Sequence, residues 1–170
     1  MSKERLFVSP EHIAGVSNVL ADALSRDRVI STEWALSKET FRAISRAHPD
    51  MEVDLFATRD NRQLPLFVSP FQDPKAIATD AFRVDWNRWR SVYLYPPTCL
   101  ILKALDKLRS FRGKAVMIAP FWPTSPFFMP LKSLARRATP IRSPVLLQYV
   151  GGRRVFCDFC KILNLHVWSF

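Results

Sequence analysis

The chain has 170 residues, about one ordinary domain, and 48% of them are apolar, so its composition excludes a disordered chain and allows a packed core. A net charge of +10 predicts a polyanionic partner, nucleic acid first, with an inert basic surface as the alternative. Only four glycines are present, in no G-x-G-x-x-G or P-loop pattern, which excludes the common phosphate-binding loops.

Targeting signals are not apparent in the sequence. The first residues lead into no apolar run typical of a signal peptide, and no stretch of about 18 apolar residues predicts a transmembrane helix. Three cysteines are too few for a disulfide framework and favour a reducing compartment. We therefore expect an intracellular protein, cytoplasmic or nuclear, without a membrane partner.

The first 49 residues predict a strand and two helices. Residues 6–8 are a short apolar strand, and a helix begins near Ser17 or Asn18, whose side chains are good N-caps. A second, amphipathic helix over residues 37–44 begins at a Ser37 cap, and Pro49 follows its end.

From residue 53 onward the pattern becomes that of an α/β domain. The apolar spacing of residues 100–108 predicts a helix that stops before Gly113. Short apolar runs predict strands at residues 53–57, 66–68, 92–95, 115–119 and 145–147, and residues 153–170 are predicted to be irregular. The helix between the strands at 92–95 and 115–119 implies a parallel pair. The sequence therefore predicts an α/β fold, with a small, partly parallel Rossmann-like sheet and flanking helices.

The most specific motif is residues 12–26, which read His-Ile-Ala-Gly-Val-Ser-Asn-Val-Leu-Ala-Asp-Ala-Leu-Ser-Arg. This motif resembles the end of the RNase H domain in retroelement polymerases. The resemblance implies that Asp22 is one of several carboxylates that hold a pair of Mg²⁺ ions, and that His12 assists product release or proton transfer. The remaining acidic ligands would lie upstream, so we expect no RNase H activity from this chain alone. Taken by itself, Asp22 is a charged residue in a helix.

A second motif covers about residues 50–130. It is similar to the domain that follows RNase H in tyrosine-recombinase (DIRS-type) retrotransposons, which in turn resembles phage-type DNA N6-adenine methyltransferases. The motif includes Asp80-Ala81-Phe82 and Tyr95-Pro96-Pro97, and its most specific parts are Asp54-Leu55-Phe56-Ala57 with Asn61, Asp85-Trp86 and residues 119–123.

This second resemblance implies a ligand site at the carboxyl edge of a parallel sheet, where open α/β sheets bind ligands. The site residues would be Asp54, Asn61, Asp85, Tyr95, Pro96 and Pro97. In active adenine methyltransferases the motif reads Asp or Asn, Pro, Pro and an aromatic residue, and it holds a flipped adenine. Here Tyr95 and Thr98 stand at the first and last positions, and the glycine-rich loop for S-adenosylmethionine is missing. We therefore expect a degenerate scaffold, and an active methyltransferase is the alternative. For the single residues, the alternatives to a ligand site are a turn-capping role for Asp54 and a core position for Trp86.

A basic segment follows residue 130. Arginine clusters suit phosphates through their bidentate geometry, and the alternative is a solvated face. The predicted nucleic-acid-binding residues are Lys132, Arg136, Arg137, Arg142, Arg153 and Arg154. Trp122, Phe127 and Phe128 are either stacking surfaces or core.

These patterns predict an RNase H remnant of a strand and a helix over residues 1–30, a linker helix over 31–49, a degenerate methyltransferase-like α/β domain over 50–135 and a basic, truncated extension over 136–170. The predicted protein is a fragment of a retrotransposon polyprotein, from the reverse transcriptase and RNase H region, without catalytic activity of its own. Its expected partners are RNA–DNA hybrid or DNA and the rest of the polyprotein. Mg²⁺ is expected only in the complete RNase H domain, and S-adenosylmethionine only for an active DNA adenine methyltransferase. A degenerate reading frame without function is a further alternative.

Overall fold

The computed structural model of the protein describes residues 35–142, 146–150, 153–156 and 163–170, with side chains for 35–142 and 163–170. The chain divides into two units after Ser31, and all described residues belong to the second unit, Thr32–Phe170. The predicted boundary after residue 30 lies one residue from this division. The predicted strand and helix of residues 1–30, with His12 and Asp22, lie outside the described residues.

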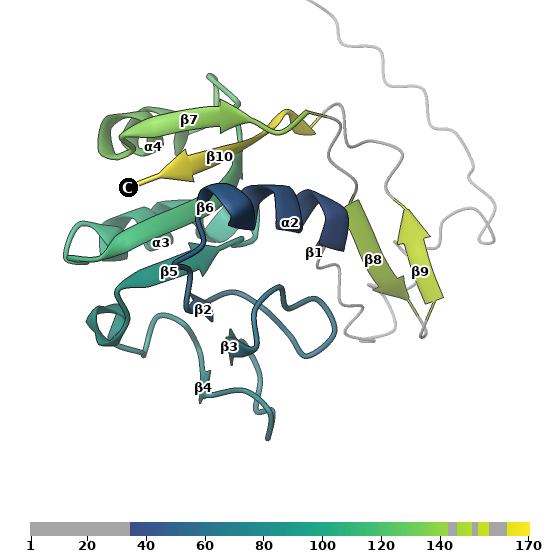
Figure 1. Ribbon diagram of the computed structural model, residues 1–170. Coiled ribbons are helices and arrows are strands. Elements are labelled where there is room, and N and C mark those ends of the chain that lie inside the picture. The colour runs from purple at the N-terminus through teal and green to yellow at the C-terminus, as the bar shows by residue number, and fades with distance from the viewer. Residues whose placement is uncertain (1–34, 143–145, 151–152, 157–162) are drawn as a thin grey trace, which may run out of the picture. The chain divides into compact units, whose positions relative to one another are not determined.

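Seven strands form the main sheet in the order β4-β3-β2-β5-β6-β10-β7 (Figure 1). The first five pair in parallel, whereas β10 pairs antiparallel with both β6 and β7. These strands are β2 (Val53–Asp54), β3 (Leu66–Ser69), β4 (Ala78–Thr79), β5 (Ser91–Leu94), β6 (Lys114–Pro120), β7 (Arg137–Pro140) and β10 (Leu165–Ser169). The predicted fold class, an α/β protein with a partly parallel Rossmann-like sheet, is confirmed.

The main sheet grows outward from β2 in two directions. β3 and β4 continue on one side of β2, and β5 and β6 continue on the other. Such a reversal leaves a crevice at the carboxyl ends of the strands, because the connections leave the two central strands in opposite directions. The strand order therefore indicates where a ligand site is to be sought.

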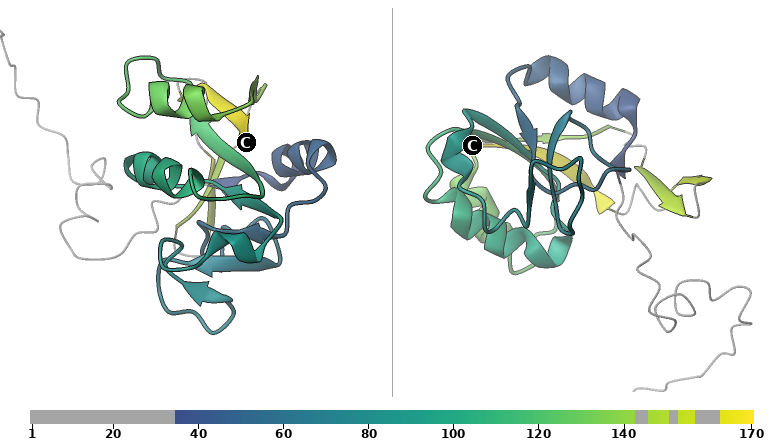
Figure 2. Two further views of the ribbon diagram at one scale, coloured as in Figure 1. Left: turned by 90° about the vertical axis from the view of Figure 1, so that its left-hand side faces the viewer. Right: turned by 90° about the horizontal axis from the view of Figure 1, so that it is seen from below.

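Helix α2 (Lys38–Ala47) covers one face of the main sheet (Figure 2). Its buried residues, Phe41 and Ile44, lie one turn apart and pack in one cluster with Tyr93 of β5 and Val116 of β6. The Phe41 and Tyr93 rings meet edge to face, with their centroids 5.2 Å apart. The helix is therefore part of the sheet domain.

Helices α3 (Ile101–Leu108) and α4 (Phe128–Leu134) cover the other face (Figure 2). They pack on the alternate residues of β6, Ala115, Met117 and Ala119, so that this strand is buried on both faces, as its continuous apolar run suggests. Two short 3-10 helices, η1 (Trp86–Arg88) and η2 (Thr98–Leu100), precede β5 and α3. None of the described helices is long and apolar enough to cross a bilayer.

A second, smaller sheet has the order β1-β8-β9 and is antiparallel throughout. Its strands are β1 (Ala35–Leu36), β8 (Leu146–Val150) and β9 (Arg153–Phe156). The prediction of a last strand at residues 145–147 is therefore only partly right. A strand does lie there, but it belongs to this second sheet, and two more strands follow it.

Most predicted elements between residues 37 and 119 are confirmed. Ser37 caps α2, and its Oγ accepts a hydrogen bond from the Thr40 backbone N–H at 3.2 Å. The predicted helix at 100–108 and the parallel pairing of the strands on either side of it are also found. β2 is shorter than the predicted strand at 53–57, because after Asp54 the backbone turns into a loop that the Asp54 side chain holds.

The C-terminal residues belong to the α/β domain, which corrects two predictions. The described residues of 153–170, a segment predicted to be irregular, include two strands, β9 and β10, and β10 lies between β6 and β7 inside the main sheet. Trp168 of β10 is 1% exposed, and its Nε1 donates to the Ala119 carbonyl at 3.1 Å. The segment 136–170 is thus no separate extension, and the helix predicted as a linker over 31–49 packs on the same sheet. Local patterns missed this because the neighbours of β10 are distant in sequence.

Candidate functional site

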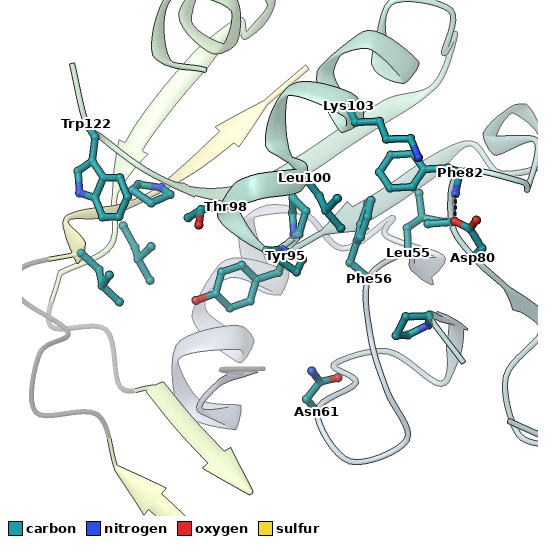
Figure 3. Close-up of a pocket in the computed structure, with 17 residues that line it drawn as sticks. Leu55, Phe56, Asn61, Asp80, Phe82, Tyr95, Thr98, Leu100, Lys103 and Trp122 are labelled. Carbon is teal, nitrogen blue, oxygen red and sulfur yellow. Dashed lines mark hydrogen bonds between the residues drawn. The ribbon is translucent and has the colours of Figure 1, made fainter. Parts of the chain in front are cut away.

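A cavity of about 590 Å³ opens at the carboxyl edge of the parallel strands (Figure 3). It spans the point between β2 and β5 where the strand order reverses, which is the usual ligand site of an open α/β sheet. Its volume lies within the range of about 300–1,000 Å³ that small-molecule sites occupy. The ends of all five parallel strands line it, through Leu55 and Phe56 after β2, Pro70 after β3, Asp80 after β4, Tyr95 after β5 and Pro120 at the end of β6.

The cavity walls are mostly apolar and aromatic. In Figure 3, Tyr95 lies between Trp122 on one side and Phe56 with Phe82 on the other. The polar residues of the lining are Asn61, Asp80, Thr98 and Lys103. A site of this composition accepts flat rings against its aromatic walls and fixes their orientation with a few polar groups.

Asp80 occupies an unusual backbone position at the end of β4. Its φ of 63° is a left-handed conformation that Asp adopts more readily than most residues. Its Oδ1 accepts from the Phe82 backbone N–H at 2.9 Å, and its Oδ2 lies 3.6 Å from Nε of Arg83. The side chain is 40% exposed, so that its carboxylate can reach a ligand in the cavity.

Lys103 and Phe82 form one end of the cavity lining (Figure 3). Nζ of Lys103 lies 4.1 Å from the centroid of the Phe82 ring, a cation–π contact. One turn further along α3, Nζ of Lys107 donates to the Phe82 carbonyl at 2.7 Å and holds that backbone in place. The cavity therefore has an aromatic ring that is held in place, with a cation over its face.

Asp54 and Asn61, two of the predicted site residues, both organise the loop after β2. Asp54 is 2% exposed, and its Oδ2 accepts from the Gln63 backbone N–H at 3.0 Å. Asp54 does not line the cavity. Its carboxylate instead caps the loop, which is the alternative role that the sequence left open. Asn61 does line the cavity, and its Oδ1 accepts from the Thr58 backbone N–H at 2.6 Å.

The structure separates the remaining predicted site residues. Tyr95, Pro96 and Pro97 line the cavity, and Asp85 does not. Asp85 is exposed, and its Oδ1 accepts from the Asn87 backbone N–H at 3.0 Å as the N-cap of η1. The prediction that Asp85 joins the other residues at the carboxyl edge is therefore wrong, because Asp85 lies near the start of β5 rather than after a strand end.

The aromatic residues with two possible roles are also resolved. Trp86 is 1% exposed and its Nε1 donates to the Ala81 carbonyl at 2.8 Å, so that it is a core residue. Phe127 and Phe128 are core residues too, at 6% and 5% exposure. Trp122 is half-buried and lines the cavity, so that it is the member of this group whose ring a ligand in the cavity can reach.

Among the described residues, the predicted basic side chains are spread over α4 and both ends of β7. Arg136 and Arg137 lie at the start of β7, and Arg142 lies just beyond its end, so that the length of the strand separates them. Lys132 is exposed on α4. The side chains of Arg153 and Arg154, at the start of β9, lie outside the described side chains.

Sequence reasoning did not select Asp80, Phe82 or Lys103 as site residues. Asp80 and Phe82 follow β4, which has two residues and is too short to show an alternating pattern. Lys103 lies on the polar side of a correctly predicted helix, where periodicity indicates exposure and nothing more. Asp80 and Phe82 do fall within the motif that resembles the retrotransposon domain, which was the one available signal.

The loop after β2 differs from the S-adenosylmethionine loop of the resembled enzymes. Within the part of the chain that the structure describes, no three His, Cys, Asp or Glu side chains gather as metal ligands. The loop after β2 contains no glycine, and its Phe56 ring packs edge-on against Phe82 and Trp86, with centroids 5.4 and 6.3 Å apart. Tyr95 stands where a carboxylate or amide would be needed. We therefore derive no methyl transfer from this site.

Comparisons with known proteins do not assign the chain to a family: no family model matches it, and no curated protein matches it significantly. Its function must therefore be inferred from the fold, the cavity and the sequence motifs.

Proposed function

We propose that this domain binds nucleic acid by taking an unstacked base into the cavity at the carboxyl edge of its sheet, and that it does so as part of a retrotransposon polyprotein, without catalysing a reaction itself. The observation that carries the proposal is the ring-lined cavity of about 590 Å³, with the Lys103 ammonium over the Phe82 ring in its lining.

The chemistry of the cavity suits a nucleobase with an adjoining phosphate. Stacking of a base on an aromatic side chain contributes about 1–3 kcal/mol and works with any base. The Lys103 ammonium group can meet a phosphate next to the stacked base, and the Asp80 carboxylate can accept a hydrogen bond from an exocyclic amino group. A net charge of +10 adds a general attraction to the phosphate backbone.

The strand order supports the methyltransferase-like origin of the domain. When the strands of the main sheet are counted along the chain from β2, their spatial order is 3-2-1-4-5-7-6, and the seventh strand is the antiparallel one. This is also the order of the S-adenosylmethionine-dependent methyltransferases that the second motif resembles. The RNase H-like motif that precedes it supports the polyprotein context, because both motifs occur in this order in the resembled retrotransposons.

An active DNA adenine methyltransferase is the second candidate, and the strand order is the observation that favours it. The residues of the motif argue against an active methyltransferase. Tyr95 and Thr98 replace the hydrogen-bond acceptor and the aromatic residue that would hold a flipped adenine. A Tyr hydroxyl stands on a long, rigid side chain and cannot take the place of a short amide.

The base-binding proposal is tested by the affinity of the chain for a short fluorescent single-stranded oligonucleotide, measured by anisotropy. Trp122→Ala is expected to weaken binding by about 5- to 150-fold, because one stacking surface is lost. Phe71→Ala is the matched control, since Phe71 is 56% exposed and lies outside the cavity lining. Wild-type affinity in a folded Trp122→Ala variant would contradict the proposal.

Calorimetric titration with S-adenosylmethionine separates the two candidates. We expect no binding, because the loop after β2 offers a Phe56 ring where a close backbone approach would be needed. Micromolar binding would contradict the proposal of a domain without catalytic activity and favour the methyltransferase.

A further inference from the structure

The opposite edge of the main sheet carries a second concave surface, which is open and strongly basic. Arg90 precedes β5, Arg112 precedes β6, Lys114 begins β6 and Arg136 precedes β7, and all four line this surface. They meet at one edge because the amino ends of β5, β6 and β7 lie beside the carboxyl end of the antiparallel β10 (Figure 1). We call these four residues the basic edge.

A glycine brings the first part of the basic edge together. The Lys114 backbone N–H donates to the Arg90 carbonyl at 2.8 Å, which joins the starts of β5 and β6. A Cβ at Gly113 would lie 2.5 Å from that carbonyl oxygen, closer than any real side chain allows. The approach of these two segments therefore requires glycine at this position.

Hydrogen bonds also fix the backbone of the other two arginines. The Arg112 N–H donates to Oδ1 of Asn87 at 3.0 Å, and the Arg136 N–H donates to the Ser169 carbonyl at 2.8 Å. The charged side chains therefore project from fixed positions on the sheet edge, which reduces the backbone entropy that is lost when a ligand binds.

The positive charge of the basic edge is only partly balanced. Nζ of Lys114 pairs with Oδ2 of Asp50 at 2.6 Å. Within the described residues no carboxylate lies at ion-pair distance from the three guanidinium groups, and all three side chains are exposed. The neighbouring Glu52 uses its Oε2 to accept the Arg90 backbone N–H at 3.3 Å. The surface therefore keeps a net positive charge, and its guanidinium groups are exposed.

We propose that the basic edge is a second nucleic-acid contact, which binds the sugar–phosphate backbone. Guanidinium groups match phosphate oxygens through two parallel hydrogen bonds, whereas backbone contacts of this kind carry no sequence information. Trp89 lies in the same lining, with the Arg88 guanidinium 5.8 Å from its ring centroid, and offers a flat surface beside the cations. The choice of nucleic acid as the polyanion rests on the proposed function, while the surface itself is independent of the cavity.

The two contacts can be tested separately because the length of β6 lies between them. Lys114 begins the strand at the basic edge, and Pro120 ends it in the lining of the cavity. Seven residues of strand span about 20 Å. A substitution at one edge therefore leaves the side chains of the other edge in place.

The test combines Arg90→Gln, Arg112→Gln and Arg136→Gln in the full chain and measures oligonucleotide affinity by anisotropy at several salt concentrations. We expect affinity at low salt to fall by about 10- to 100-fold, and the slope of log affinity against log salt to become shallower by about 2, since three phosphate contacts are lost. Trp122→Ala should lower affinity with an unchanged slope, so that failure of the cavity proposal and failure of this one give different results.

The control combines Arg42→Gln, Arg46→Gln and Lys75→Gln, which are exposed positions outside both linings. Both triple variants lower the net charge by three, so that equal losses of affinity would show a diffuse charge effect and overturn the proposal. Undiminished binding by the basic-edge variant would also overturn it.

A third variant carries Lys at the three arginine positions and guards against damage to the fold. It keeps the charge, so the salt slope should remain that of the wild type while affinity falls less than in the Gln variant. A loss as large as that of the Gln variant would contradict an electrostatic contact. Displacement of the oligonucleotide by polyglutamate as readily as by unlabelled DNA would contradict nucleic acid as the partner of this surface.

Discussion

The two edges of the main sheet differ in kind. At the carboxyl ends of the parallel strands, loops with several prolines and aromatic rings enclose a cavity. At the amino ends, short turns held by backbone hydrogen bonds present arginines to solvent. Under the proposed function, the two edges divide nucleic-acid binding between them, with shape at one edge and charge at the other.

The largest effect is expected from a residue on which both edges depend. Trp168→Ala should lower the free energy of unfolding by about 3–5 kcal/mol, because the ring is 1% exposed and stacks on Phe121 with centroids 5.9 Å apart. Urea denaturation measures the loss, and the exposed Phe71→Ala should stay within about 0.5 kcal/mol of wild type. A similarly small change for Trp168→Ala would mean that β10 is not part of one cooperative sheet.

A smaller loss is expected at the carboxyl edge. Asp54→Ala should cost about 1.5–3 kcal/mol of stability, since a buried carboxylate that accepts the Gln63 N–H is removed. Asp85→Ala is the matched variant and should cost about 1 kcal/mol or less, because that side chain is an exposed cap of a short helix. Equal losses in chemical denaturation would argue against the structural role of Asp54.

The amino edge is tested by Gly113→Ala. The added methyl group would meet the Arg90 carbonyl and the Phe111 ring, each 2.5 Å away, and should cost about 1–3 kcal/mol. Ser110→Ala, at an exposed position of the same turn, serves as the control. If thermal unfolding of the two variants coincided with that of the wild type, the close approach of β5 and β6 at this edge would be refuted.

The smallest effect is expected at Tyr93, midway along β5. Its hydroxyl is buried and has no hydrogen-bond partner among the described residues, and burial, with the nearby Asp54 carboxylate, raises the pKa of Tyr93 well above 10. Tyr93→Phe should therefore leave stability unchanged or raise it by up to about 1 kcal/mol.

The pH dependence of Tyr93 follows from the direction of this shift. A folded-state pKa above the unfolded one leaves wild-type stability intact below pH 10 and diminishes it as the pH rises further. The Phe variant should lack this alkaline loss in urea titrations on either side of pH 10. Parallel losses in both proteins would rule out Tyr93 as the source.

Local patterns predicted the longer elements well, and they failed for a very short strand and for a strand with distant neighbours. The Ser37 cap, the apolar stripe of α3 and the doubly buried β6 follow from side-chain chemistry and periodicity within one element. β4 has two residues and carries no pattern, and β10 is defined by neighbours that are distant in sequence.

The sequence predicted where the candidate site lies better than it predicted which residues line it. The carboxyl edge, Asn61 and the Tyr95-Pro96-Pro97 turn are found in the cavity lining. Asp85 was misplaced because a residue in a loop can serve either of the strands that the loop joins. The basic edge was missed because Arg90, Arg112 and Lys114 are scattered in sequence and become neighbours only when β5 and β6 pair.

The position of β7 has a consequence for synthesis on the ribosome. Its described partner in the main sheet is β10, which emerges later, so β7 must wait unpaired until that strand has docked on β6. At about 5–20 residues per second this interval lasts on the order of seconds. The strand is suited to the delay: it is exposed throughout, begins with Arg137 and ends with Pro140, and these are features that discourage a waiting strand from joining another chain.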